Sequence, residues 1–382
     1  MKRLKIMHLA SFAGNIGDNA MHDGAYRTRA ADFDDEIDYS RHEIRDYYHW
    51  RKRAFDAAFL DEANASDLVI IGGFSLFQLW RAETQTGTYV DAPIDFFSKI
   101  SKPVVFYGVG ADVTRAINSD AVDKCKRFLD LVLGLENYRF SFRNDGSAGL
   151  ISDVLGNGYT DKMAVIPDGG LFVGPGDGDR PSFLPPQRFV AINIAGDMAD
   201  IRYGTSGETH AFDRFLREIA AGIEAILALP EEVDCVLVPH IYSDLSLISA
   251  VLDRLDDRYR RTRVRVAPYV QGETGWRDSF ECYRRADLVI GMRYHACLSS
   301  MGFATPVLGL TTHHKIAGQF AAYGLQDRCF SWDGDLSGLF ETAVGELRAG
   351  SKIQQDLARI QSRERDVLRA HHRDIQSWMQ TI

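Results

Sequence analysis

Short apolar runs alternate with longer amphipathic segments along most of this chain. Apolar runs that end at glycine or polar residues are typical of buried parallel strands, and periodic segments between them are typical of helices. The predicted strands are Leu4–Ala10, Leu68–Gly72, Val104–Gly108, Phe140–Arg143, Ala164–Pro167, Phe189–Ile194, Cys235–Pro239, Val264–Ala267, Leu288–Gly291 and Val307–Leu310. The predicted helices include His49–Ala63, Asp120–Leu135, Phe212–Leu229 and Leu245–Leu255.

A stretch rich in glycine and proline, Gly174–Pro186, divides this pattern into two series. Such a stretch is a candidate linker, and a strand–helix series on each side of it predicts two doubly wound α/β domains facing a cleft. We place the N-terminal domain at residues 1–178 and the C-terminal domain at residues 186–350. Residues 351–382 are predicted to form a C-terminal helix that packs back across the domains.

Composition narrows the class of protein. The chain has 382 residues, of which 45% are hydrophobic and 25% are charged, as is ordinary for a soluble globular protein. Its formal net charge of −9 argues against a general nucleic-acid surface, because binding to phosphate backbones needs a basic face. No apolar segment approaches the roughly 20 residues that span a bilayer, and the N-terminus lacks the apolar core of a signal peptide. Five dispersed cysteines without a CxxC pair indicate reduced thiols and a cytoplasmic protein.

The strand end at Gly291 carries the strongest candidate chemistry. Arg293 and His295 follow it, where a helix is predicted to begin. Ligands of open α/β sheets bind beyond the carboxyl ends of the strands, and a helix N-terminus adds partial positive charge there. The pattern therefore predicts a site for an anionic ligand beside a proton-transfer group. The alternative is structural: Arg293 forms a salt bridge to a neighbouring domain and His295 caps a turn.

Glycine-bearing loops follow the first predicted strands. Asn15, Gly17 and Asp18 follow the first strand, and Gly72 and Gly73 follow the second. Glycine lets a backbone approach a ligand closely, while Asn and Asp offer hydrogen bonds. The same residues also form ordinary turns, in which Asp18 or Asn19 would cap a helix. A P-loop is excluded, because no Gly-Lys-Ser/Thr follows.

Other polar patterns are weaker. The Gly108–Gly110 turn lacks the third glycine of a dinucleotide-binding loop, since Val113 stands in its place. The segments Asp177–Asp179 and Asp333–Asp335 match a DxD metal motif but lie in turn-like sequence, so we predict no metal. Asp168 follows a strand, where its carboxylate could accept a proton, orient a sugar hydroxyl or satisfy a turn.

Taken in their order along the chain, the motifs resemble the polysaccharide pyruvyl transferase family. They are Asn15-x-Gly17-Asp18, Gly72-Gly73, Gly108-x-Gly110, Phe142-Arg143-x-x-x-Ser147, Pro167-Asp168, Gly291-x-Arg293-x-His295 and Gly302-x-x-x-Pro306-Val307. Phe74 departs from the family pattern where a third glycine is common, and Asn144 departs where an acidic residue often follows the arginine. These departures concern the acceptor side more than the donor side.

The resemblance implies two Rossmann-like domains in a GT-B-like arrangement. It also implies transfer of a pyruvyl group from phosphoenolpyruvate (PEP) to two hydroxyls of a sugar, which forms a cyclic ketal and releases phosphate during synthesis of exopolysaccharide or another cell-surface glycan. PEP is then a co-substrate, and no cofactor is expected. The acceptor is a sugar or oligosaccharide. The sequence leaves open whether it is lipid-linked and whether the chain forms a homo-oligomer.

Such a reaction needs a general acid, a base and cations on the leaving phosphate. His295 is the predicted acid/base and Arg293 the predicted donor anchor, with Asp168 as a further catalytic carboxylate. The other predicted contacts are Tyr294 and Arg202 to the donor, and Asn15, Asp18, Gly72 and Gly73 to the acceptor on the opposing domain.

Two other functions share this architecture. A nucleotide-sugar glycosyltransferase would need a carboxylate in the second domain to hold a ribose, for which Glu281 is a candidate. A non-catalytic carbohydrate-binding protein would release no phosphate from PEP with any acceptor. Protection from heating by PEP or by UDP-sugars separates the two enzymes, since a ligand stabilises only the fold that binds it.

Overall fold

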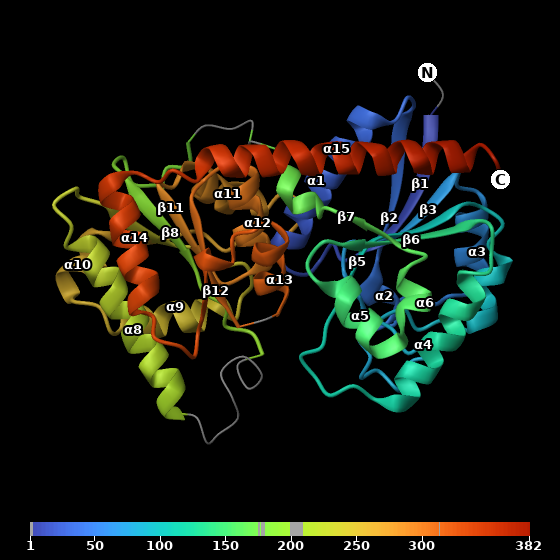
Figure 1. The fold of residues 1–382 in the computed structure, drawn as a ribbon, viewed down its shortest axis with the longest axis horizontal. Helices are drawn as coiled ribbons and strands as arrows, with labels where there is room; N and C mark the ends of the chain where they lie inside the picture. Colours follow the sequence, from blue (N-terminus) through green and yellow to red (C-terminus); the bar gives the residue numbers. More distant parts are fainter. Residues whose placement is uncertain (1–2, 175, 177–179, 199–208, 313) are drawn as a thin grey trace. The chain divides into compact units, whose positions relative to one another are not determined.

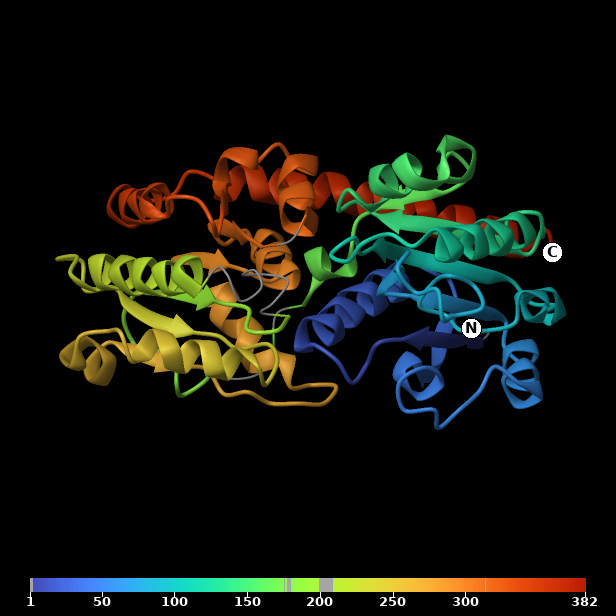
Figure 2. The same ribbon diagram turned by 90° about the horizontal axis from the view of Figure 1, so that it is seen from below.

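The computed structural model describes residues 3–174, 176, 180–198, 209–312 and 314–382, which form two compact units. Unit 1 contains Met1–Ala13, Ala25–Asp168 and Glu364–Ile382, and unit 2 contains Gly14–Gly24 and Gly169–Arg363. Each unit has a parallel sheet with helices on both of its faces (Figures 1 and 2). The predicted α/β architecture with two domains is therefore confirmed.

The sheet of unit 1 has the strand order β2-β1-β3-β5-β6-β7, with β4 paired to β5 off this path. Its strands are β1 (Arg3–Ala10), β2 (Glu36–Glu43), β3 (Leu68–Gly72), β4 (Ser75–Phe77), β5 (Val104–Ala111), β6 (Tyr138–Arg143) and β7 (Ala164–Ile166). Its helices are α2 (Ile44–Tyr47), α3 (Ala57–Asn64), η1 (Ile94–Lys99), α4 (Ser119–Val132), α5 (Ser147–Leu155) and α6 (Asn157–Thr160). The chain leaves β1 for β2 and returns to β3 on the other side, so the topological switch point lies between β1 and β3.

The core of unit 1 explains why its central strands are continuously apolar. Every residue of β3 and β5 is buried, as expected for parallel strands covered on both faces. Aromatic rings from neighbouring strands fill the space above them, and Phe106 stacks on Phe140 with 4.2 Å between ring centroids. This rigid core fixes the loops that follow the strands.

The sheet of unit 2 has the strand order β10-β9-β8-β11-β12-β13. Its strands are β8 (Phe189–Asn193), β9 (Asp234–Leu237), β10 (Val264–Val266), β11 (Leu288–Gly291), β12 (Val307–Thr311) and β13 (Cys329–Ser331). Its helices are η2 (Gly169–Phe172), α8 (Thr209–Leu227), α9 (Asp244–Leu252), α10 (Asp257–Thr262), α11 (Trp276–Arg285), α12 (Tyr294–Gly302), α13 (His314–Ala322), η3 (Gln326–Arg328) and α14 (Ser337–Ala349). The switch point of this sheet lies between β8 and β11.

Two helices have residues in both units, α1 (Ile16–Asp32) and the C-terminal α15 (Gln354–Met379). Within unit 2, the Gln361 side chain donates to the carbonyl of Gly302 at 2.8 Å. Within unit 1, the Arg365 guanidinium pairs with Asp32 at 2.6 Å. The described helices include none that is long and apolar enough to cross a membrane.

The structure differs from the sequence predictions in several elements. The helix predicted over His49–Ala63 is wrong in its first half, because α3 begins at Ala57 after the N-cap residue Asp56. Strands β2, β4 and β13 were not predicted. The units also differ from the predicted domain ranges, since Gly14–Gly24 groups with unit 2 and the later boundary falls at Asp168. Part of the predicted linker lies outside the described residues.

Candidate active site

The short strand β11 places Arg293 at the carboxyl edge of the unit 2 sheet. Arg293 is the N-cap residue of α12 and has extended backbone, with φ −109° and ψ 141°. Its N–H donates to Oδ1 of Asn193, the last residue of β8, at 2.9 Å. This bond joins the ends of the two strands that flank the switch point. The start of α12 thus brings the partial positive charge of a helix N-terminus to the place where ligands of such sheets bind.

The guanidinium of Arg293 is buried and held by two carboxylates. Its Nε donates to Oδ2 of Asp244 at 2.9 Å, and its Nη2 donates both to Oδ1 of Asp244 and, at 2.9 Å, to Asp197. Burial alone would lower the pKa of Arg293, but these carboxylates raise it above its ordinary value. Within the described residues Nη1 makes no hydrogen bond. The Nε–Nη2 face of Arg293, the predicted donor anchor, is therefore occupied by Asp244, and Nη1 is the nitrogen that remains.

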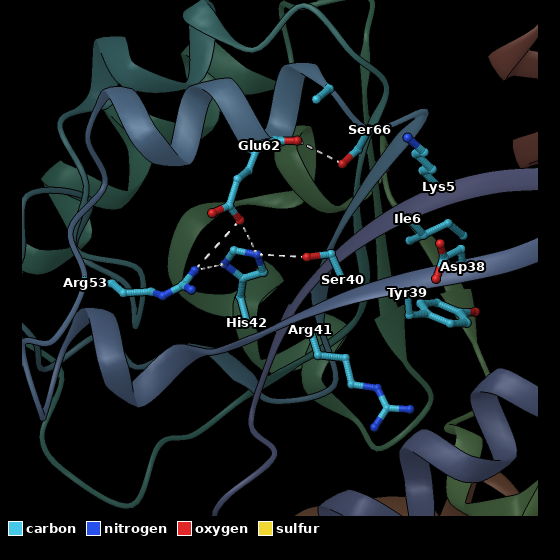
Figure 3. Close-up of a pocket in the computed structure, with 11 residues that line it drawn as sticks. Lys5, Ile6, Asp38, Tyr39, Ser40, Arg41, His42, Arg53, Glu62 and Ser66 are labelled. Atoms are coloured by element: carbon cyan, nitrogen blue, oxygen red, sulfur yellow. Dashed lines mark hydrogen bonds and ion pairs between the residues drawn. The ribbon is translucent and has the colours of Figure 1, made fainter.

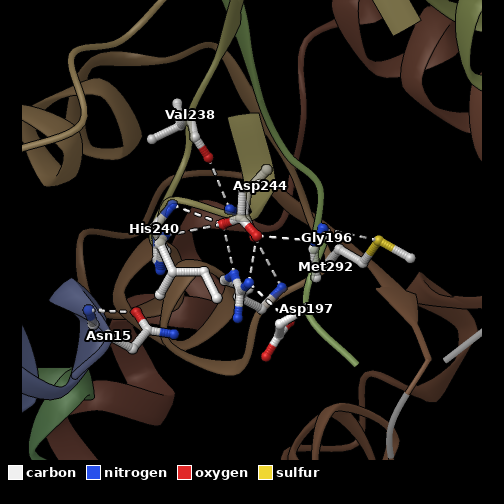
Figure 4. Close-up of polar contacts among 12 residues, drawn as sticks. Asn15, Gly196, Asp197, Val238, His240, Asp244 and Met292 are labelled. Carbon is white, nitrogen blue, oxygen red and sulfur yellow. Dashed lines mark hydrogen bonds and ion pairs between the residues drawn. The ribbon is translucent and has the colours of Figure 1, made fainter. Parts of the chain in front are cut away.

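Asp244 is the central acceptor of this network and was missed by the sequence analysis. Its side chain is fully buried and accepts hydrogen bonds from the backbone N–H groups of Gly196 at 2.8 Å, His240 at 2.8 Å and Ile241 at 3.2 Å, besides those from Arg293 (Figure 4). It thereby ties the segments after β8 and β9 to the start of α12. The signal was present: Asp244 opens the helix that follows β9, the same kind of position that drew attention to Arg293.

His295 lies beside the start of α1. Its Nδ1 is 3.7 Å from Oδ1 of Asp18, and its side chain is nearly buried. Gly17 passes so close that an added Cβ would lie 2.8 Å from Cβ of His295, so no other residue fits there without a shift. Asn15, rather than Asp18, caps α1, because its Oδ1 accepts the N–H of Gly17 at 2.8 Å. Asn15 and Asp18, which we expected on the opposing domain, thus belong to the same unit as His295.

His240 is a second histidine of this network. Its Nε2 lies 2.7 Å from the hydroxyl of Tyr283, and its carbonyl accepts the N–H of Ile16 at 3.4 Å. Complete burial, reinforced by the nearby Arg293 and His295, lowers the pKa of His240 well below its ordinary value. The imidazole is therefore neutral, and Nδ1 has no hydrogen-bond partner among the described residues. His240 connects the start of α1 to the Asp244 network.

The remaining predicted site residues lie elsewhere. Asp168 belongs to unit 1, where it is buried and lies 3.6 Å from Nη1 of Arg143. Gly72 packs against β5, since an added Cβ would lie 2.0 Å from the carbonyl oxygen of Tyr107, and Gly73 has φ 74°. Close packing and turn geometry therefore account for both glycines. Arg202 lies outside the described residues.

Tyr294 and the Asp333–Asp335 segment are both engaged in contacts within the protein. The hydroxyl of Tyr294 donates to the side chain of Gln319 at 2.5 Å, and its ring packs edge-on against that of His295, with centroids 5.1 Å apart. In the Asp333–Asp335 segment, Asp335 accepts the N–H of Ser337 at 2.8 Å, which is ordinary turn chemistry. The described residues contain no group of three His, Cys, Asp or Glu side chains placed to hold a metal ion.

A pocket of about 560 Å³ lies at the β2 edge of unit 1 (Figure 3). Its lining residues include Lys5, His42, Arg53 and Glu62, but none of the predicted site residues. His42 is held between Oε2 of Glu62 at 2.7 Å and the hydroxyl of Tyr47 at 2.6 Å. Much of the polar lining is therefore engaged in contacts within the protein.

Glu281, the carboxylate proposed to hold a ribose, is also engaged. Both of its oxygens accept hydrogen bonds from Arg284 at 2.7 Å, and Arg285 donates to one of them at 2.7 Å. Burial alone would raise the pKa of Glu281, but these partners lower it to about 2. The sequence feature that favoured a nucleotide-sugar site is thus a structural ion pair.

Solved structures define the class of fold. The S. aureus MnaA–UDP co-structure matches with a TM-score of 0.53 and 9% identity, over 94% of this chain and 91% of that chain. UDP-GlcNAc 2-epimerase from Methanocaldococcus jannaschii matches with a TM-score of 0.54 and 11% identity, over 92% and 94%. The N-terminal domain of Candida albicans trehalose-6-phosphate phosphatase matches with a TM-score of 0.55 and 13% identity, over 99% and 97%. The protein has a GT-B-type fold, and at these identities the likeness extends to the fold alone.

Sequence comparison gives the family. The family model described as polysaccharide pyruvyl transferase matches residues 15–314, which is most of the chain and includes the Arg293–His295 segment. The chain belongs to the polysaccharide pyruvyl transferase family, as its motifs indicated, and this family places it among transferases. None of the curated proteins compared with the chain matches it significantly.

Proposed function

We propose that this protein transfers the pyruvyl group of PEP to two hydroxyls of a sugar acceptor. Membership of the family supports the transferase reaction. The single observation that carries the donor assignment is Arg293, a buried arginine fixed by Asp244 at the switch point of unit 2 with one guanidinium edge unused. A carboxylate or phosphate is the ligand that such an edge at a helix N-terminus favours.

The chemistry balances with the groups that the site offers. A proton is added to the methylene carbon C3 of PEP, which leaves C2 as an oxocarbenium-like centre. One sugar hydroxyl attacks C2 and gives up its proton to a base. The second hydroxyl then forms the other C2–O bond while the C2–O bond to phosphate breaks, and its proton is also lost. The products are a cyclic ketal and inorganic phosphate: of the two hydroxyl protons, one replaces the proton given to C3 and the other leaves with the phosphate.

His295 is the group assigned to these proton transfers, because an imidazole can donate and accept a proton near neutral pH. Asp18 lies beside Nδ1 and orients the ring. The guanidinium of Arg293 cannot lose its proton in a protein, so its role is to bind the donor and stabilise charge. We assign Asn15 and Asp18 to an acceptor hydroxyl, because both lie at the start of α1 beside this histidine.

Charge balance shows that Arg293 does not act alone. Asp244 and Asp197 together carry more negative charge than Arg293 offsets, while PEP brings a carboxylate and a phosphate. Further positive groups must therefore meet the donor. Lys315 is in the first turn of α13, which follows β12, the neighbour of β11, and Arg202 is a further candidate from the sequence. We place the proposed reaction in the cytoplasm, as the five dispersed cysteines without a CxxC pair indicate.

Phosphate release tests the proposal. Full-length protein is incubated with PEP and a panel of galactosides, mannosides and glucuronosides, and free phosphate is measured with and without each acceptor. We expect acceptor-dependent release with at least one member. Thermal protection is measured in parallel: PEP raises the melting temperature if the proposal is right. Protection by UDP-sugars without protection by PEP would favour a glycosyltransferase, and phosphate release in no case would contradict the pyruvyl transfer.

A further inference from the structure

We infer that unit 1 carries a saccharide-binding surface formed by Tyr48, His49, Trp50, Arg81 and Tyr89, which we name the aromatic cluster, and that it binds a pyranose residue of the acceptor glycan. The identification of that glycan as the acceptor rests on the proposed function. The binding of a saccharide does not. These residues were not among those predicted from the sequence, and none of them belongs to unit 2.

The aromatic cluster lies at the carboxyl edge of the unit 1 sheet. Tyr48, His49 and Trp50 follow α2, directly after β2, and Arg81 and Tyr89 lie in the loop after β4. β2 pairs with β1 and β4 pairs with β5, so the two loops begin on either side of the central strands β1 and β3 that border the switch point. The location is the one at which α/β domains bind ligands.

The rings and the arginine are packed in a fixed arrangement. The Arg81 guanidinium lies 4.6 Å from the Tyr48 centroid and 4.8 Å from the Tyr89 centroid. The His49 ring is 4.8 Å from that of Tyr48 and 5.8 Å from that of Tyr89. The hydroxyl of Tyr48 donates to Glu83 at 2.6 Å. Side chains that are already held need little further ordering when a ligand binds.

The loop after β4 is built to hold Arg81 and Tyr89 in place. Between them, the side chains of Thr84, Thr86 and Thr88 are fully buried, and Thr84 donates to the carbonyl of Thr88 at 3.0 Å. Gly87 has φ 64°, and an added Cβ would lie 2.0 Å from the carbonyl oxygen of Ala121. Loops are usually mobile and solvated. A loop with a buried polar interior instead presents its exposed residues rigidly, as a binding site requires.

The loop after β2 is held just as firmly. Arg51 has φ 50°, a left-handed conformation that costs energy for a residue with a side chain. The carbonyl of Asp46 stabilises it by accepting the N–H groups of Lys52 at 2.8 Å and Arg53 at 3.0 Å. Arg53 also contacts His42 at 2.9 Å at the rim of the pocket in Figure 3. Strained backbone that the surroundings maintain is characteristic of functional loops.

The exposed groups have the chemistry of a saccharide site. Trp50 is 46% exposed, and Lys52 Nζ lies 4.9 Å from its ring centroid, so the opposite face is the one offered to the C–H face of a pyranose. His49 is exposed, and its ring nitrogens have no hydrogen-bond partner among the described residues; partial burial, with Arg81 and Arg45 nearby, lowers its pKa. A neutral imidazole offers one donor and one acceptor, as sugar hydroxyls do. Glu83 adds an exposed carboxylate.

Charge pairing favours a saccharide over an anionic membrane surface. Three of the four Lys and Arg residues from Arg45 to Arg53 face carboxylates: Arg45 pairs with Glu43 at 3.1 Å, Lys52 with Asp46 at 3.9 Å and Arg53 with Glu62 at 3.8 Å. Binding to anionic lipids needs clustered and uncompensated positive charge. Aromatic rings beside a few polar groups are instead what ligand sites present to small molecules.

The test measures saccharide binding to full-length protein by calorimetric titration, without PEP, using oligosaccharides that contain galactose, mannose or glucuronate. We expect Trp50→Ala and His49→Ala each to weaken binding of the best oligosaccharide by about 3- to 10-fold, the scale of a lost aromatic contact. Trp50→Phe keeps an aromatic face and should retain most of the affinity. Tyr159→Ala removes a partly buried tyrosine from α6 of the same unit and should change nothing.

Each outcome decides the inference. Saccharide affinity equal in wild type, Trp50→Ala and His49→Ala would overturn it, as would absence of binding to any oligosaccharide, or binding to anionic vesicles that alone depends on Trp50. If the wild type binds an oligosaccharide through the aromatic cluster but releases no phosphate from PEP, the surface stands and the pyruvyl transfer fails. If both hold, the variants should raise the KM for the acceptor and leave the KM for PEP unchanged.

Discussion

Two buried arginines lie at the ends of parallel strands in this protein, and they differ in how many of their guanidinium nitrogens are engaged within the protein. Arg143 ends β6 in unit 1 and is 4% exposed, while Arg293 follows β11 in unit 2 and is 6% exposed. Arg143 donates through Nε to Asp145 at 2.5 Å and through Nη2 to Ser75 at 3.4 Å, and its Nη1 lies 3.6 Å from Asp168. Among the residues that the structure describes, Arg293 donates through Nε and Nη2 and makes no hydrogen bond through Nη1.

The position in each sheet explains the difference. β6 lies in the uniform run β5-β6-β7, where neighbouring loops pack closely, and an added Cβ at Gly110 would lie 2.5 Å from the Arg143 guanidinium. β11 lies at the switch point, where successive loops diverge to opposite sides. An arginine after a strand is therefore informative only with the topology in hand: one is a structural ion pair, and the other is fixed by carboxylates but open at one edge.

The largest expected effect is on turnover at the site in unit 2 that contains Arg293 and His295. His295→Ala should lower the rate of phosphate release by roughly 10²–10⁴, because it removes the proton-transfer group while Arg293 and its carboxylates keep their contacts. The melting temperature and the protection by PEP should stay close to those of the wild type. The same measurements on His371→Gln, a histidine of unit 1, provide the control. Near-native turnover of a folded His295→Ala protein would remove this residue from the mechanism.

Arg143 should contribute to the stability of the folded protein and not to binding of the donor. Arg143→Met leaves Asp145 and Asp168 buried without their partner, so we expect a loss of about 3–5 kcal/mol in the free energy of unfolding. Urea denaturation measures it. The affinity of the remaining folded protein for PEP should be unchanged. Stability within about 1 kcal/mol of wild type, a typical effect for a point mutation, together with a loss of PEP affinity would reverse the assignment of the two arginines.

Arg293→Lys tests whether Arg293, in contrast to Arg143, binds the donor. Lysine keeps the charge but cannot pair with both oxygens of Asp244 and still present a second edge, so we expect a loss of about 1.5–3 kcal/mol in PEP binding. Thermal-shift titration with PEP gives the affinity. The matched variant is Arg328→Lys, since Arg328 forms a comparable two-point pair with Glu346. If both variants bind PEP as the wild type does, Arg293 is not the donor anchor.

The sequence identified the elements whose residues carry their own signal. Leu68–Gly72 and Leu288–Gly291 were predicted residue for residue, because a central parallel strand is apolar on both faces. β2 was missed because it is an edge strand with alternating polar residues such as Glu36, Asp38 and Ser40. The helix predicted from His49 fails because the left-handed Arg51 and the double acceptor at Asp46 stabilise a loop instead.

The same distinction applies to the site. Arg293 and His295 could be found because they adjoin a strand end and lie close in sequence. The position of Asp244 at the start of a helix after β9 was visible in the sequence, but its partners were not, since Gly196, His240 and Arg293 meet it only when β9, β8 and β11 become neighbours. Asp18 was placed on the wrong side because α1 begins after a unit 1 strand, yet its first residues pack in unit 2. The role of Asp244 and the unit to which Asp18 belongs both depend on contacts between segments far apart in the sequence.

A further predicted effect is gradual and concerns the acid sensitivity of unit 1, where α15 contributes His371 and His372. Burial lowers the pKa of His371 to about 4 and that of His372 to about 3, although Asp32 beside His372 works in the opposite direction. Both histidines are neutral in the folded protein, while the unfolded chain binds protons below the ordinary histidine pKa of about 6.5. Their contribution to stability is therefore complete above pH 6.5 and is lost as the pH falls towards the folded values. In that window, each histidine lowers the free energy of unfolding by up to about 1.4 kcal/mol for each pH unit of acidification. Urea unfolding of wild type and His371→Gln between pH 7 and about 4.5 should show a shallower loss for the variant, and equal slopes would mean that His371 is not held neutral by its burial.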